Sequence, residues 1–356
     1  MNPSTHALLA VGTYTESMAD SEGQPGAGIH LLRLDLASGE LSEAVVHSGP
    51  VNPTYLTSAL DKLYSIREVG RDASPSLDVF ALDRAAATLT PLSSLSTPGS
   101  GPCHVSVDSL RSLVLVSNYN SGEVLAYSLD PDGLPWDEPV VMTRSGSGPD
   151  SERQDGPHAH CARTSPDGHF VYLCDLGTDK VMRHPVIDGR VRTSADLTLA
   201  ARPGAGPRHL DFTPSGRHLL VNNELASSLS LYRLSGDEVA LVQELSTLSG
   251  EVEGNKVAAL CIHPSGRFVY VSNRGEDSVF AARLDEAAGS LTRLGSWKAG
   301  GRTPRGMAVS PDGRFLLVAS QDDGLIQVFR IEPDDGGLQP LETRYPIDSA
   351  VCLHFT

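Results

Sequence analysis

Basic charge, cysteine and aromatic side chains are all scarce in this chain of 356 residues. The 28 lysines and arginines are outnumbered by 44 aspartates and glutamates, and the net charge of −16 opposes binding to nucleic acid or to an anionic membrane. The five cysteines form no Cys-x-x-Cys pair, which predicts reduced, mostly buried thiols and no disulfide framework. Aromatic residues make up 5% of the chain, which disfavours a protein-docking platform lined with surface aromatics.

Long apolar runs and helical periodicity are absent as well. No apolar run approaches the roughly 18–20 residues that cross a bilayer, so we expect no membrane partner. The opening segment MNPSTHALLAVGTYT has no basic stretch before an apolar one, so we expect no signal peptide and a cytoplasmic location. Short apolar strands separated by polar turns fill the chain, and this pattern predicts an all-β protein.

A turn motif recurs along the second half of the chain. It reads SPDG at 165–168, TPSG at 213–216, HPSG at 263–266 and SPDG at 310–313, at spacings of 48, 50 and 47 residues. Proline presets φ for a turn, aspartate or serine bonds to the local backbone, and glycine accepts positive φ. An apolar run follows each copy, which predicts strand–turn–strand hairpins. The segment 60–70 carries the same second strand behind a degraded turn.

These hairpins belong to repeats of about 50 residues. The chain is longer than the roughly 250–300 residues that a single hydrophobic core holds, so it forms either two domains or one ring of small repeated cores. Six units are complete, and the seventh is split between strands at 8–15 and 28–35 and a lone strand at 350–355. Pairing the N- and C-terminal strands would remove two exposed edges. We therefore predict one domain over 1–356, a seven-bladed β-propeller of four-stranded antiparallel blades whose ring is closed by that pairing.

The scaffold residues repeat from blade to blade, but the polar residues beside them differ. In a propeller the innermost strands line a central channel, so differing polar groups at their starts, and at the ends of the next strands, converge on one axis. Tyr14, Tyr55, Glu68, Asn118, Asn223 and Gln321 occupy such positions. The residues that we select as the site are His104, Tyr119, His158, His160, Asp175, Arg208, His209, Glu224, Arg274 and Arg305.

Two histidines, His158 and His160, stand two residues apart at the start of a predicted inner strand. Residues i and i+2 of a strand share a face, so both imidazoles can enter the channel as a general base or as hydrogen-bonding groups. A metal site would need a third ligand, such as Asp175 or Glu224, and a purely structural histidine pair is the remaining alternative. No ligand spacing supports a metal, and no Gly-x-Gly segment precedes a helix, so we expect neither metal nor cofactor.

Two arginines, Arg208 and Arg274, fall in corresponding regions of adjacent blades. They can clamp a phosphate or carboxylate through charge-assisted hydrogen bonds. The alternative is pairing between blades with Glu224 or Asp175, and Glu224 itself is either an ion-pair partner or an acid–base group. The polar segment 143–157 before the histidines is either a lid over one channel mouth or a tolerated insertion.

The segments VGTYT, GPCHVSVD, RQDGPHAH, CDLGTDKV, GPRHLDFTPSGR, NNEL and FVYVSNRGEDSV occur in this order along the chain. Together they resemble the seven-bladed lactonase family, which includes bacterial 6-phosphogluconolactonases and fungal carboxy-cis,cis-muconate lactonising enzymes. The resemblance implies an active site without metal, containing His158 or His160, Arg208, Glu224 and Arg274. It implies that a sugar δ-lactone, 6-phospho-D-glucono-1,5-lactone, is opened to its acid. We expect His104, Tyr119, Asp175, His209 and Arg305 to bind the substrate.

Lactone hydrolysis requires a base that activates water and donors for the developing oxyanion. We expect His158 or His160 to be the base, the two arginines to hold the oxyanion or the phosphate, and Glu224 to orient one of them. The alternatives are a muconate-type or other sugar-lactone activity on the same fold, and a propeller without catalysis that serves as a binding platform. The expected partner is a small anionic sugar lactone, and the expected state a monomer or weak homo-oligomer.

Overall fold

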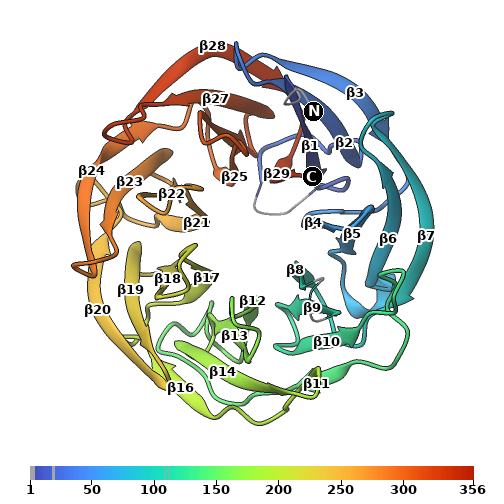
Figure 1. Ribbon diagram of the computed structural model, residues 1–356, viewed down its shortest axis with the longest axis vertical. Helices are drawn as coiled ribbons and strands as arrows, with labels where there is room; N and C mark the ends of the chain where they lie inside the picture. The colour runs from blue at the N-terminus through green and yellow to red at the C-terminus, as the bar shows by residue number, and fades with distance from the viewer. Residues whose placement is uncertain (1–4, 18–20, 109, 111) are drawn as a thin grey trace.

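The computed structural model describes residues 5–17, 21–108, 110 and 112–356. In this part of the chain, antiparallel strands form seven sheets arranged as the blades of one ring (Figure 1). The innermost strands of the first to seventh blades are β4 (Leu56–Ala59), β8 (Pro102–Asp108), β12 (Ala159–Thr164), β17 (Pro207–Phe212), β21 (Lys256–Ile262), β25 (Pro304–Val309) and β29 (Ala350–Phe355). The second strands are β5 (Lys62–Arg67), β9 (Leu113–Asn118), β13 (Phe170–Asp175), β18 (His218–Asn223), β22 (Phe268–Arg274), β26 (Phe315–Ser320) and β1 (His6–Thr13).

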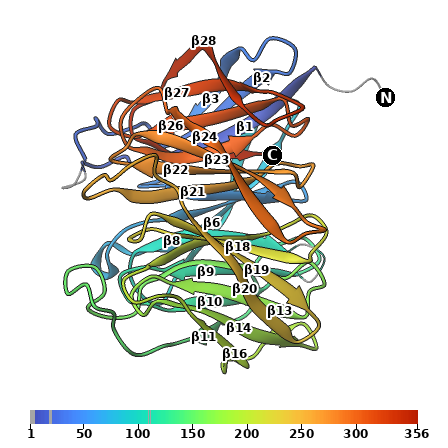
Figure 2. The ribbon, with the colours of Figure 1, turned by 90° about the vertical axis from the view of Figure 1, so that its left-hand side faces the viewer.

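The outer half of each blade completes the sheet at the rim, which Figure 2 shows edge-on. The third strands are β6 (Ser76–Asp83), β10 (Val124–Ser128), β14 (Lys180–Ile187), β19 (Ser228–Ser235), β23 (Ser278–Asp285), β27 (Leu325–Ile331) and β2 (Ile29–Asp35). The outermost strands are β7 (Thr88–Ser96), β11 (Val140–Met142), β20 (Glu238–Ser246), β24 (Ser290–Lys298), β28 (Leu338–Pro346) and β3 (Leu41–His47). In the third blade this strand is divided into β15 (Arg190–Val191) and β16 (Leu197–Ala200), both paired with β14.

The ring closes as the sequence predicts. Strand β1 pairs with β29 in antiparallel register, with Val11 opposite Leu353, so one blade combines both ends of the chain. Strands β1 and β29 accordingly lie side by side in Figure 1. The closure gives β29 a partner strand and places β1 between β29 and β2, and the prediction of a seven-bladed all-β propeller is confirmed.

The hydrophobic core lies between the blades. In the described chain, seven clusters of buried apolar residues each draw on two neighbouring blades, as where Val79 of the first blade packs with Val114 of the second. The second strands are mostly buried, and β9 is buried along its whole length, whereas an outermost strand such as β7 contains only exposed and partly buried residues. Burial of each cluster holds two blades together, so the channel wall rests on the packing of the whole ring.

The repeated turn motif forms the predicted hairpins. In the first copy, the Gly168 amide donates to the Ser165 carbonyl at 2.8 Å, and Gly168 has a φ of 74° that suits glycine. The first blade differs, because only Leu60 and Asp61 connect β4 to β5 and Leu60 itself has a φ of 54°. This confirms that the turn in segment 60–70 departs from the motif.

Two expectations from composition can be compared with the structure. All five cysteines lie in the described ranges and are free, and four of them are buried. Within the same ranges, no helix has the length and apolar character needed to cross a membrane.

Candidate active site

A β-bulge near the start of the innermost strands determines which side chains face the axis. In β8 the register moves from Pro102 opposite Asn118 to His104 opposite Ser117, so one extra residue, Cys103, lies between the two pairs. A bulge bends the strand and re-aims the extra side chain. The same shift in β12, β17, β25 and β29 makes the extra residues His160, Arg208, Arg305 and Val351.

These extra residues line one cavity on the propeller axis, which we call the axial cavity. Residues from all seven blades contribute to its wall, and the empty space of about 510 Å³ within that wall includes open solvent. We call this end of the channel, where the inner strands begin, the site mouth. Among the ten predicted site residues, those that line the axial cavity are His160, Arg208, His209 and Arg305.

A buried carboxylate, Glu224, lies beside the cavity at the end of β18. Its Oε2 accepts hydrogen bonds from Arg208 Nε at 2.9 Å and forms an ion pair with Arg274 Nη2 at 3.0 Å. Its Oε1 accepts from Arg153 Nη2 at 2.7 Å. We call these four residues the Glu224 cluster. Because Arg274 comes from the neighbouring blade, pairing between blades, one of the alternatives drawn from the sequence, is present.

The charges of this cluster do not balance. Among the described residues, three guanidinium groups contact one carboxylate, which leaves an excess of two positive charges. Burial alone would raise the pKa of Glu224, but Arg274, Arg208 and Arg153 outweigh it and hold that pKa well below its usual range. Burial and the neighbouring arginines lower the pKa of Arg274. Such a site favours a ligand that brings negative charge.

Arg153 was not among the predicted site residues. It belongs to the segment 143–157, where the buried Gln154 donates to the Leu176 carbonyl and to Asp179 Oδ1, both at 2.8 Å. These bonds anchor the segment to the third blade and bring Arg153 to Glu224 and to the Tyr119 hydroxyl, 3.2 Å from Arg153 Nη2. The motif RQDGPHAH contained this residue, but nothing in its spacing shows that the loop folds back onto Glu224.

The two histidines of the predicted pair do not share a face. The bulge lies between Ala159 and Cys161, so the rule of alternating side chains fails at this point, and only His160 lines the axial cavity. His158 stacks on Tyr119 instead, with its Nδ1 2.8 Å from the Tyr119 carbonyl and its Nε2 3.1 Å from Asp155. Both neighbours accept hydrogen bonds, which leaves His158 poorly arranged to take a proton from water.

Three further rings support the cavity wall behind His160. His209 lies 5.3 Å from His160 and 5.7 Å from His104, and His104 lies 4.4 Å from Tyr55, between ring centroids. Burial, followed by the charge of Arg208, lowers the pKa of His160 and of His209 well below its usual range; burial does the same for His104. Neutral rings at this position shape the cavity and offer hydrogen bonds without adding charge.

Asp175, which the sequence suggested as a substrate-binding residue, lies outside the lining of the axial cavity. It is fully buried, its Oδ1 accepts from the backbone amide of His158 at 2.8 Å, and its Oδ2 accepts from the Thr178 hydroxyl at 2.7 Å. These bonds hold the strand end and the turn in place, away from the cavity wall. His104 and Tyr119 also lie outside the lining of the axial cavity, the first behind Tyr55 and the second beside Arg153.

No group of three or more metal-ligating side chains gathers anywhere in the described part of the chain. The metal alternative for His158 and His160 would also need both imidazoles on one side of the strand, which the bulge prevents.

A second polar cluster lines the opposite side of the site mouth, at the sixth, seventh and first blades. Glu68 Oε1 accepts from the Tyr14 hydroxyl at 2.9 Å, and its Oε2 accepts from the Thr54 hydroxyl. Arg305 Nη2 donates to the same Tyr14 hydroxyl at 2.9 Å. We call these four residues the Glu68 cluster, and Glu68, Thr54 and Arg305 line the axial cavity. Of them, only Arg305 was selected as a site residue, although Tyr14 and Glu68 were expected to lie at the channel.

Comparison with known proteins agrees with this architecture. A family profile described as "Lactonase, 7-bladed beta-propeller" matches residues 8–355. A 6-phosphogluconolactonase of Bacillus subtilis is 31% identical over 350 residues, 97% of each chain, and one of Formosa agariphila is 28% identical over 352 residues, 97% of this chain and 98% of that one. A solved structure described as a Pseudomonas aeruginosa periplasmic gluconolactonase superposes with a TM-score of 0.87 at 29% identity, covering 99% of both chains. The chain therefore belongs to the lactonase family of seven-bladed β-propellers.

Proposed function

We propose that this protein hydrolyses the lactone of a phosphorylated sugar acid, 6-phospho-D-glucono-1,5-lactone, to 6-phosphogluconate. The observation that carries the proposal is the Glu224 cluster, which has two excess positive charges and whose Arg208 lines the axial cavity. A phosphomonoester carries about −1.5 to −2 charges at neutral pH, which complements this excess. Relatives named 6-phosphogluconolactonase along the whole chain support the same substrate.

In this proposal Arg208 and Arg274 hold the phosphate, with Arg153 as a third contact. Arg274 Nε is buried and has no hydrogen-bond partner among the described residues, so a donor is available for an incoming oxygen. Through its ion pairs, Glu224 holds the guanidinium groups of Arg208 and Arg274 in place. An arginine side chain suits this role because its planar fork matches the oxygens of a phosphate.

Neutral His160 and His209 contact the sugar on the cavity wall in the same proposal. Their rings lie beside Arg208, whose Nη1 is 3.0 Å from His209 Nε2. Each neutral imidazole has one donor and one acceptor, which fits the hydroxyl groups of a sugar ring.

The direct test is an acid-release assay with freshly generated 6-phosphogluconolactone, corrected for spontaneous hydrolysis. We expect hydrolysis well above background, and at least about a tenfold loss of kcat/KM in Arg274→Ala, on the order of 1.4 kcal/mol. Wild-type rates in His160, Arg208 and Arg274 variants alike would refute this site.

The same assay with unphosphorylated glucono-1,5-lactone and with a carboxymuconate lactone distinguishes the alternatives. Preference for the carboxylate-bearing lactone would point to muconate-type chemistry, since arginines bind carboxylates as well. No acceleration with any lactone would favour a binding platform. A cytoplasmic location, a role in the pentose phosphate pathway, and a monomeric or weakly oligomeric state remain predictions; the Pseudomonas aeruginosa relative is described as periplasmic.

A further inference from the structure

The Glu68 cluster combines a carboxylate, two hydroxyls and an arginine, which are groups that can carry out acid–base chemistry. The phosphate binding proposed above does not involve these residues. Glu68 is the single aspartate or glutamate among the described residues that line the axial cavity. It lies across the cavity from the Glu224 cluster, because its partners come from the first, sixth and seventh blades.

The hydrogen bonds around Glu68 form a directed chain. The Arg305 guanidinium donates to Tyr14 Oη, the Tyr14 hydroxyl donates to Glu68 Oε1, and the Thr54 hydroxyl donates to Glu68 Oε2. Two hydroxyl donors leave Glu68 as the acceptor on both oxygens, which is the arrangement of a carboxylate. Each oxygen retains further lone-pair capacity for a water molecule in the cavity.

The other acid–base groups of the site are less suited to remove a proton from water. Both oxygens of Glu224 are occupied by arginines, and His158 lies outside the cavity lining between two acceptors. His160 and His209 line the cavity, but burial beside Arg208 disfavours their protonated forms. Cys103, which also lines the cavity, is a buried thiol.

We propose that Glu68 is the general base of lactone opening, with Tyr14 as its positioning residue and Arg305 as the oxyanion donor; this inference rests on the proposed function. Glu68 takes a proton from water while the water oxygen bonds to the lactone carbon, and the carbonyl π electrons move to its oxygen, which Arg305 stabilises. When the tetrahedral intermediate collapses, the bond from carbon to the ring oxygen breaks. The protonated Glu68 then returns its proton to that oxygen, so one water is consumed and Glu68 is regenerated.

The arrangement also matches the shape of the substrate. The phosphate and the lactone carbonyl lie at opposite ends of the sugar, and the two clusters lie on opposite sides of the site mouth. Binding the phosphate at Arg208 would direct the carbonyl towards Arg305 and Glu68.

The experiment compares Glu68→Gln and Glu68→Asp with the wild type in the acid-release assay, using 6-phosphogluconolactone between pH 5 and 8. General-base catalysis contributes about 10²- to 10⁴-fold. We expect Glu68→Gln to lose at least about 100-fold in kcat with KM changed less than about threefold. Glu68→Asp should retain part of the activity, because it keeps the carboxylate.

Glu16→Gln is the matched control, since Glu16 is an exposed acid near the same mouth that accepts from Asn52 Nδ2 at 3.0 Å. It should keep wild-type kcat. Binding of 6-phosphogluconate, measured by calorimetry, should persist in Glu68→Gln and show that the variant is folded. If that variant does not fold, Tyr14→Phe replaces it, with an expected loss of about tenfold in kcat at unchanged KM.

The two proposals fail in different ways. An inactive wild type on every lactone would overturn the proposed function. An active wild type with unchanged kcat in Glu68→Gln, or in Tyr14→Phe when it is the replacement, would overturn the role of Glu68 and leave the proposed function standing.

Discussion

The site mouth contains two carboxylates with opposite surroundings. Glu224 is enclosed by three guanidinium groups and is 3% exposed at its side chain, whereas Glu68 is bonded by two hydroxyls and borders the cavity. Charge neutralisation makes Glu224 a fixed counter-ion that keeps arginines in place. Glu68 has neutral hydroxyl donors in place of guanidinium groups, which fits the role of general base that we propose for it. The same residue type can thus organise binding on one side of the channel and chemistry on the other.

The two sides also differ in how they are built. The Glu224 cluster joins the fourth and fifth blades to the loop before the third, so it ties three repeats together. The Glu68 cluster joins the first, sixth and seventh blades around the closing strand pair. No single blade contains either cluster, so each forms only when its three blades pack together.

The largest expected effect is on stability, in Glu224→Gln. Removing this carboxylate leaves three guanidinium groups without a counter-charge, and breaking a buried ion pair costs about 3–5 kcal/mol. Urea unfolding at pH 7.5 measures the loss. Glu244→Gln is the control, because Glu244 pairs with an exposed arginine, Arg202, and should lose less than about 1 kcal/mol.

Adding inorganic phosphate to the same unfolding experiment tests whether the arginines bind an anion. Added inorganic phosphate should stabilise Glu224→Gln more than the wild type, because the unpaired arginines gain an anion. Equal losses in the Glu224 and Glu244 variants would show that the Glu224 cluster is not a structural ion-pair centre.

The next largest effect is the dependence of stability on pH. The pKa values of His104, His160 and His209 are lowered by burial, so the unfolded chain binds more protons than the folded one below about pH 6.5. Stability should therefore fall as pH decreases below about 6.5, by up to about 1.4 kcal/mol per pH unit for each ring. Glu224, whose pKa is depressed, adds a further loss below about pH 4.3.

Urea unfolding at pH 7.5, 6.5 and 5.5 tests this slope. His209→Gln should reduce it by up to about 1.4 kcal/mol per pH unit, and the exposed His169→Gln should leave it unchanged. A slope that is the same in both variants would contradict the buried, neutral state of His209.

A smaller effect is expected for Arg153→Met, which tests the division between binding and chemistry. Losing one partly exposed phosphate contact should raise KM for the phosphorylated lactone about tenfold, or about 1.4 kcal/mol, with kcat within about twofold. KM for glucono-1,5-lactone should not change. Arg202→Met serves as the control on an exposed pair, and an equal change for both substrates would argue against a phosphate contact at Arg153.

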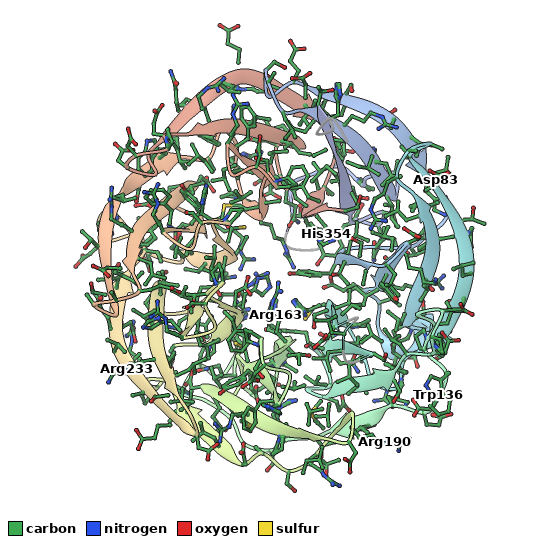
Figure 3. The ribbon with its side chains drawn as sticks, in the orientation of Figure 1. Asp83, Trp136, Arg163, Arg190, Arg233 and His354 are labelled. Carbon is green, nitrogen blue, oxygen red and sulfur yellow. The ribbon has the colours of Figure 1, made fainter. Side chains whose placement is uncertain are left out.

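The smallest effect is expected at the other end of the channel. Arg163 lies beside the central opening in Figure 3, at the end where the repeated turns lie, and its Nη1 is 3.8 Å from Asp211 Oδ1. Both side chains are partly exposed, so Arg163→Gln should change the free energy of unfolding by less than about 1 kcal/mol. kcat/KM should stay within twofold, and a tenfold loss would show that this mouth takes part in catalysis.

Much of the architecture could be predicted from local patterns. Turn motifs such as that at 165–168, and apolar strands after them, depend on neighbouring residues, so repetition reveals the blades and the unpaired end strands reveal the closure. Arg208, His209, His160 and Arg305 were selected because polar residues that vary among repeats mark the channel, and they do line it.

The site itself was only partly predictable, since side-chain direction depends on register. The alternation rule placed His158 and His160 together, but the bulge in β12 separates them, and a bulge leaves no clear mark in a single sequence. Asp175 stands at the same kind of strand end as Glu224, yet one caps a turn and the other gathers arginines.

The repeats, the turns and the pairing of the two chain ends follow from sequence because each is specified by residues close along the chain or by an obvious missing partner. The grouping of Glu224 with Arg153 and of Glu68 with Arg305 was decided by the closed ring. Along the sequence, Glu224 and Arg153 belong to neighbouring repeats, whereas the Glu68 cluster joins residues from both ends of the chain. Only the register of every inner strand, with its bulge, brings their side chains to a common mouth.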